Sequence, residues 1–130
     1  MKNQKTTIGQ VMTERPHCIS SEITLDIALK KMQQIKVRHL PVRERGELVG
    51  IISERDAELV ARLRDPTRTT VGDVMTPDPY SVLPSTPLIE VLTTMLNKRI
   101  GSTLMIDEEG LVVGIFTSTD AIRTLAHMLK

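Results

Sequence analysis

The chain contains an internal repeat, and this repeat limits the folds that it can adopt. The run 48–56 (LVGIISERD) returns as the run 112–120 (VVGIFTSTD). Each copy is an apolar, β-branched run with one glycine, which allows close approach, followed by Ser or Thr and, three residues later, Asp. This order predicts a strand that leads directly into the N-terminus of a helix.

Matches on either side extend the repeat over most of the chain. Met12-Thr13 returns as Met75-Thr76, and the apolar helix pattern that begins at Leu25 returns at Leu88, 63 residues later. We therefore expect two similar units, roughly residues 1–66 and 67–130. Because a unit of about 60 residues is only marginally stable alone, the two units are expected to pack on each other.

Hydrophobic periodicity and turn residues predict the same order of elements in each unit, β-α-β-β-α. In the first unit we expect a strand near 18–19, a helix at 25–35 with Thr24 as N-cap, a hairpin of strands 39–42 and 48–53, and a helix that ends before Pro66. Pro41 suggests an edge or strand-start position.

In the second unit we expect a strand near 81–82, a helix with Thr86 as N-cap and Pro87 in its first turn, strands 103–106 and 111–117, and a helix from Thr119 to about Met128. The fold class is α/β, of the α+β type. Each unit is expected to be a small sheet that carries its helices on one side.

The composition excludes several classes of binding partner and of metal site. With 17 basic and 16 acidic residues, no Trp, one Tyr and one Phe, the chain offers neither a basic surface nor a stacking platform, so we expect no nucleic-acid partner. Cys18 is the single cysteine, which excludes an intrachain disulfide and a thiolate metal site and suits a reducing cytoplasm. No signal-peptide core or membrane-spanning apolar run is present, so we expect no membrane partner.

These motifs together resemble a pair of CBS motifs, the tandem unit called a Bateman module. The resemblance covers nearly the whole chain and rests on 11–13 and 74–76 (both VMT), on 37–42 (VRHLPV), and on the two repeated runs that end at Asp56 and Asp120. It implies two motifs packed by their sheets about a pseudo-twofold axis, with two clefts that hold adenosine-containing ligands.

The resemblance also implies the residues of each cleft. The cleft of Asp120 would combine residues from both repeats, namely Thr13, Cys18, Ile19, Val37, Arg38, His39 and Arg55 facing Ile115, Thr117, Thr119 and Asp120. The reciprocal cleft would combine Ile51, Ser53, Arg55 and Asp56 with Thr76, Ser81, Val82, Ile100, Gly101 and Ser102. We rank the Asp120 cleft first, because Arg38 and His39 can neutralise phosphate better than Gly101 and Ser102.

Ser/Thr-x-x-Asp has two physical interpretations. A carboxylate accepts two hydrogen bonds from the cis-diol of a ribose, and the adjacent helix N-terminus favours a phosphate. The same residues also form a capping box, which needs no ligand. One aspartate can serve both roles, and in the context of the paired repeat we favour ligand binding.

The resulting hypothesis is a stand-alone regulatory module that binds AMP, ADP, ATP, NAD or S-adenosylmethionine and signals to an effector protein by a change in shape. The residues do not choose among these ligands. We expect a homodimer formed through apolar helix positions such as Leu59, Leu63, Leu125 and Met128.

The alternative to this regulatory module is a structural dimerisation module with empty clefts. An enzyme is disfavoured, because His17, His127 and Cys18 show no partner at catalytic or metal-ligand spacing.

Overall fold

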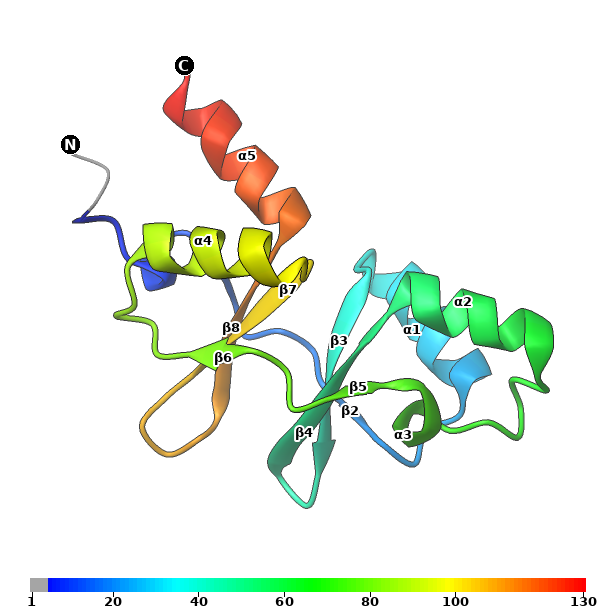
Figure 1. Cartoon of the computed structure of the whole chain (residues 1–130). Helices are drawn as coiled ribbons and strands as arrows, with labels where there is room; N and C mark the ends of the chain where they lie inside the picture. The colour runs from blue at the N-terminus through cyan, green and yellow to red at the C-terminus, as the bar shows by residue number, and fades with distance from the viewer. Residues whose placement is uncertain (1–4) are drawn as a thin grey trace. The chain divides into compact units, whose positions relative to one another are not determined.

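A computed structural model describes residues 5–130 of the chain, which form two compact units (Figure 1). The central unit is His17–Pro79, and the terminal unit combines the described residues up to Pro16 with Tyr80–Lys130; both are named for their positions in the sequence. The units therefore differ from a simple cut between the two repeats, because the segment before residue 17 folds with the second repeat. None of the helices in the described residues is long and apolar enough to cross a membrane.

The central unit contains a four-stranded sheet in the order β2-β3-β4-β5. Its strands are β2 (Ile19–Ser20), β3 (His39–Glu44), β4 (Glu47–Ser53) and β5 (Thr76–Pro77), and its helices are α1 (Leu25–Ile35), α2 (Glu54–Leu63) and α3 (Val71–Val74). Strands β2 and β3 are parallel and are joined through α1, whereas the other two pairs are antiparallel.

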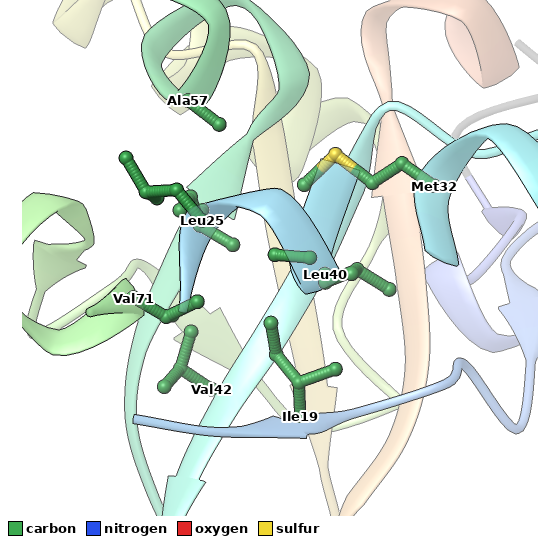
Figure 2. Close-up of a cluster of buried hydrophobic side chains, with 9 residues drawn as sticks. Ile19, Leu25, Met32, Leu40, Val42, Ala57 and Val71 are labelled. Carbon is green, nitrogen blue, oxygen red and sulfur yellow. The ribbon is translucent and has the colours of Figure 1, made fainter. Parts of the chain in front are cut away.

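One face of this sheet forms the core of the central unit. Strand residues and residues of all three helices bury their side chains together there (Figure 2), and the buried set is Ile19, Leu25, Ala28, Met32, Leu40, Val42, Ile52, Ala57 and Val71. Leu40 lies opposite Ile52 in the β3–β4 ladder, so both side chains leave the sheet on the same face. The helices of the unit therefore lie on one side of its sheet, as the sequence predicts.

The terminal unit repeats this plan with sheet order β1-β8-β7-β6. Its elements are η2 (Ile8–Gln10), β1 (Thr13–Glu14), β6 (Ser81–Val82), α4 (Leu88–Lys98), β7 (Ser102–Ile106), β8 (Val112–Thr117) and α5 (Ser118–Met128). Its buried cluster is Ile8, Leu88, Val91, Met95, Met105 and Phe116. Ile8 comes from the N-terminal segment, so this segment supplies core as well as a strand.

The ends of α1 and α4 show how closely the two units correspond. Lys36 and Arg99, 63 residues apart, both adopt the left-handed conformation with φ of 58° and 56°. The next residue then donates its N–H back into the helix, from Val37 to Met32 O and from Ile100 to Met95 O, both at 3.0 Å. Each closure satisfies a terminal carbonyl and directs the chain into β3 or β7.

The polar connection after α2 is an ordered turn built on Asp65. The Thr67 hydroxyl and the Thr67 backbone N–H donate to Asp65 Oδ1 at 2.6 and 2.9 Å. These two hydrogen bonds favour the charged carboxylate, so they hold the pKa of Asp65 below its usual value. Thr69 then donates to the Asp65 carbonyl at 2.9 Å, which leads the chain back toward α1 and α3.

The structure corrects three details of the sequence prediction. The N-cap of α4 is Pro87 rather than Thr86, because Pro87 keeps an extended ψ of 135° and the helix begins at Leu88. Pro41 lies in β3, which is an interior strand and not an edge. It is tolerated there because β2 is only two residues long and pairs with Val42 and Arg43, beyond Pro41.

The third correction concerns the number of strands. Each sheet has one strand more than the predicted β-α-β-β-α order, namely β1 in the terminal unit and β5 in the central unit. Both strands contain two residues, too few to show a period of two in the sequence. Both begin at the threonine of a VMT motif.

Each added strand lies close to its neighbour because the neighbouring strand has a glycine there, and a methionine side chain fills the space that a β-carbon would take. A β-carbon on Gly50 would lie 2.5 Å from Met75 Sδ and 2.8 Å from the Thr76 carbonyl oxygen. A β-carbon on Gly114 would likewise collide with Met12 Sδ. The close approach predicted from the repeated glycine is therefore the contact that places β5 against β4 and β1 against β8.

We expect Gly50→Ala to lower the free energy of unfolding by about 1–3 kcal/mol, because the added methyl group forces β5 and Met75 away from β4. Urea denaturation followed by circular dichroism measures the change. Gly101→Ala is the matched control, since its β-carbon would meet only Ser118 Oγ at an ordinary 3.5 Å. Equal losses in the two variants would contradict this account of the repeated glycine.

Candidate functional site

The N-terminus of α5 is organised by a reciprocal pair of hydrogen bonds between Thr117 and Asp120. The Asp120 backbone N–H donates to Thr117 Oγ1 at 3.3 Å, and the Thr117 N–H donates to Asp120 Oδ2 at 2.9 Å. The Thr117 hydroxyl also donates to Asp120 Oδ2 at 3.1 Å. This is the capping box that the sequence predicts, with the carboxylate at the positive end of the helix.

The Asp120 carboxylate is nearly enclosed, with 10% of its side chain exposed. Its other oxygen, Oδ1, accepts a hydrogen bond from Arg123 Nη1 at 2.7 Å and faces the Thr13 hydroxyl at 3.5 Å. Arg123 was not among the predicted site residues. The signal for it in the sequence is the spacing of three between Asp120 and Arg123 on a predicted helix, which brings opposite charges together.

Residues far apart in the sequence surround this helix end within the terminal unit. Thr13 of β1 pairs with Ile115 of β8, and Ser102 at the start of β7 pairs with Thr117. The Gly101 carbonyl accepts the Ser118 N–H at 3.0 Å. Thr13, Ile115 and Thr117, which were predicted for the Asp120 cleft, thus lie around this helix end. Gly101 and Ser102 also lie there, although they were predicted for the reciprocal cleft. Thr119 lies in the first turn of α5 with its side chain exposed.

The equivalent helix end of the central unit has the same frame with different contacts. Ser53 Oγ accepts the Asp56 N–H at 3.1 Å, His39 pairs with Ser53, Thr76 pairs with Ile51, and the Arg38 carbonyl accepts the Glu54 N–H at 2.7 Å. Unlike Asp120, however, Asp56 is exposed, and its carboxylate makes no hydrogen bond to any other residue among 5–130. The two aspartates of the repeat therefore occupy different environments.

The remaining predicted residues divide between the units. Cys18, Ile19, Val37 and Arg55 belong to the central unit, and Ser81, Val82 and Ile100 belong to the terminal unit. Cys18 and Ile19 line a cavity of about 260 Å³ between β2 and α1, whose other lining residues are Ser20, Ile23, Ile27, Ala28 and Lys31. In the described part of the chain, no three His, Cys, Asp or Glu side chains come close enough to hold a metal ion.

Comparison with known proteins identifies the family. The family model of the CBS domain matches residues 8–57 and 71–127. The chain therefore belongs to the CBS domain family and carries two copies of the motif, as the repeat predicts. A CBS domain-containing protein of Dictyostelium discoideum is 27% identical over 138 residues, which cover 97% of this chain and 95% of that protein.

Other relatives are much longer than this chain. A homoserine O-acetyltransferase of Methanococcoides burtonii is 30% identical over 121 residues, which cover 92% of this chain but 24% of the enzyme. An inosine-5'-monophosphate dehydrogenase of Nitrosopumilus maritimus is 32% identical over 113 residues, and the match covers 23% of that enzyme. The likeness to these enzymes is thus confined to about a quarter of each.

Some solved structures with the same fold contain adenosine compounds. The CBS domain pair of protein MJ0100, solved with 5'-methylthioadenosine and S-adenosyl-L-methionine, has a TM-score of 0.85 and 26% identity, over 95% of this chain and 98% of that one. CBSX2, solved with AMP, has a TM-score of 0.79 and 29% identity over 95% and 98% of the two chains. The fold of this chain is therefore that of a CBS domain pair.

We expect the two repeat aspartates to differ in their contribution to stability. Asp120→Asn removes a buried charge that accepts several hydrogen bonds, so it should lower the free energy of unfolding by about 1–2 kcal/mol. Asp56→Asn is the matched control and should change it by less than about 0.5 kcal/mol, because Asp56 is exposed. Urea denaturation of both variants tests this, and a larger loss for Asp56→Asn would refute the assignment of a structural role to Asp120 alone.

Proposed function

We propose that this chain is a regulatory module that binds an adenosine-containing ligand at Asp120 and transmits the binding to an effector protein. The observation that carries the proposal is the enclosed Asp120 carboxylate at the N-terminus of α5, next to Thr13 and Thr117. The AMP, 5'-methylthioadenosine and S-adenosyl-L-methionine complexes of similar CBS pairs support this ligand class. Their shared part is adenosine, and its ribose carries the diol that a carboxylate recognises.

The chemistry of the site suits this ligand. A carboxylate is an acceptor only, and a cis-diol presents two donors at the spacing of its two oxygens. The N-terminal N–H groups of α5 and the Thr117 hydroxyl favour an anion beside the ribose. The other predicted contacts, including Arg38, His39 and Arg55, stay predictions that a structure with ligand would test.

The proposed mode of action is a shift between conformations and not catalysis. A ligand changes the population of a conformation only by its difference in affinity for the available states. We therefore expect an effector protein to sense the ligand through such a difference. In a longer relative such as inosine-5'-monophosphate dehydrogenase, the matching region is 23% of the enzyme, which is consistent with a module added to a separate catalytic part.

Asp120→Asn should weaken AMP binding about tenfold to a hundredfold, because one acceptor facing the diol becomes a donor and the charge is lost. Calorimetric titration of AMP measures the dissociation constant in the wild-type protein and the variant. Asp56→Asn is the control and should leave binding at Asp120 within about twofold. If Asp120→Asn binds AMP as the wild type does, Asp120 is a helix cap only and the proposed site is wrong.

A second candidate function, a structural association module, is supported by apolar side chains that are exposed in the described chain. On α5 and its C-terminal end, Ile122 is 70% exposed, Leu125 58% and Leu129 77%, and on α2 Leu63 is 76% exposed. Exposed apolar residues at helical spacing are typical of surfaces that associate. This candidate and the ligand hypothesis are compatible, and we propose a homodimer in either case.

Sedimentation equilibrium at micromolar concentration should give twice the monomer mass, and Leu125→Glu should shift the equilibrium toward monomer, because it introduces a charge into an apolar contact. Thr93→Glu on α4 serves as a control for an exposed charge elsewhere. A wild-type monomer would contradict the dimer.

Ligand binding is measured separately, by thermal shift. A ligand at 100 times its dissociation constant stabilises the folded protein by about 2.7 kcal/mol, so a panel of adenosine compounds that causes no shift would leave only the association role.

A further inference from the structure

The hydrogen-bonding capacity of the Asp120 carboxylate is filled by the protein itself. A carboxylate offers about four lone-pair directions. Oδ2 accepts from the Thr117 N–H at 2.9 Å and the Thr117 hydroxyl at 3.1 Å. Oδ1 accepts from Arg123 at 2.7 Å and faces the Thr13 hydroxyl at 3.5 Å. A ribose diol can therefore bind Asp120 only by replacing donors that belong to the protein.

The donors differ in how easily they can be replaced. The two Thr117 bonds form the capping box of α5, so their loss would weaken the helix N-terminus. Arg123 is held by a single ion pair, and its side chain is 69% exposed. Water solvates the exposed guanidinium once it is freed, which lowers the cost of breaking the pair even though the Asp120 carboxylate is enclosed. The Thr13 hydroxyl, at 3.5 Å from Oδ1, is the weakest of these donors, and a ribose hydroxyl replaces it readily. Among the other donors, Arg123 is the one that a ribose hydroxyl displaces at least cost.

We propose that Arg123 is a specificity-determining residue, which makes the Asp120 site selective for adenosine ligands that carry an anionic group next to the ribose. The inference rests on the proposed function, since it concerns the ligand class of the same site. The ribose hydroxyl takes the place of Arg123 at Oδ1. The guanidinium, released one helical turn from the ribose position, then pairs with the anion of the ligand. A neutral nucleoside must also displace this guanidinium from Asp120, but it has no anionic group with which the guanidinium can pair.

The first repeat offers a natural comparison for this position. Leu59 lies three residues after Asp56, as Arg123 lies three residues after Asp120, and Leu59 is 55% exposed on α2. The repeat therefore tolerates an apolar residue there, and leucine and arginine have similar helix propensities. Arg123→Leu transfers the side chain of the first repeat into the second and is expected to fold.

The test compares adenosine and AMP as probes, by calorimetric titration of the full chain. Arg123→Leu should bind adenosine about two- to fivefold more tightly, because the ion pair that competes with the diol for Asp120 Oδ1 is gone. AMP should lose a charge-assisted contact at the same time, so the ratio of AMP affinity to adenosine affinity should fall at least about tenfold. Arg123→Lys keeps the charge and should retain most of this ratio.

Two further variants make the result decisive. Arg123→Gln is a second neutral replacement, to be used if Arg123→Leu melts well below the wild type, and the same changes are expected. Arg62→Leu removes an exposed arginine of α2 and should change neither affinity. An unchanged ratio in the neutral variants overturns the role of Arg123, and weaker adenosine binding shows that Arg123 only orients Asp120.

The outcomes also separate this inference from the proposed function. If the wild-type protein binds both probes and Asp120→Asn weakens both, while the neutral Arg123 variants leave the ratio unchanged, the proposed function stands and the inference falls. If the wild-type protein binds neither probe, both fall together. A drop in the ratio with tighter adenosine binding supports both.

Discussion

The absence of a side chain at Gly50 and Gly114 is the constraint on which the added strand of each sheet depends. Met12 lies against Gly114 and Met75 lies against Gly50, at distances that no β-carbon would permit. Each contact holds a two-residue strand in place, and that strand carries the threonine of the VMT motif. In the terminal unit, this places the Thr13 hydroxyl within 3.5 Å of Asp120. A packing contact in the sheet thus determines the composition of the candidate site.

The two repeats share one frame and use it differently. Both have a hydroxyl at the N-cap, an aspartate three residues later and the start of a central strand alongside. The two helix ends differ in burial and in one further position, where Arg123 pairs with Asp120 while Leu59 offers no charge to Asp56. A symmetric scaffold thus carries two chemically distinct helix ends, and only one of them has a carboxylate already oriented by several donors.

Most of the fold could be predicted from the sequence, because each helix or strand assigned in one repeat could be checked against the corresponding residues of the other. The helices α1 and α2, the β3–β4 hairpin and their counterparts follow from periodicity, turn residues and caps that recur at a fixed offset. The same offset could have corrected the N-cap of α4, since Thr24 corresponds to Pro87 and not to Thr86. Strands β1 and β5 escaped prediction. They are no shorter than β2 and β6, which were predicted, but each follows a short helical turn at the edge of its sheet, so no local signal marks it as a strand.

The site was predicted less completely than the fold, for a physical reason. The capping box is local, so Thr117 and Asp120 could be recognised from spacing alone. The burial of Asp120 and the exposure of Asp56 depend on side chains from other elements, which local spacing does not reveal. Arg123 stands between these cases: its spacing from Asp120 could have suggested a pairing, which was not predicted, and its place among the donors of a filled carboxylate is visible only in the structure.

The pairing of β1 with β8 has a consequence for how the chain folds. Residue 13 bonds to residue 115, whereas the central unit is a continuous stretch from His17 to Pro79. During synthesis the central unit can therefore close early, with its strands paired over short separations. The terminal unit must wait for β8, with Ile8 and Met12 exposed to solvent or chaperones in the meantime. An interruption of synthesis before residue 112 would leave a central unit of marginal stability and an unpaired apolar N-terminal segment.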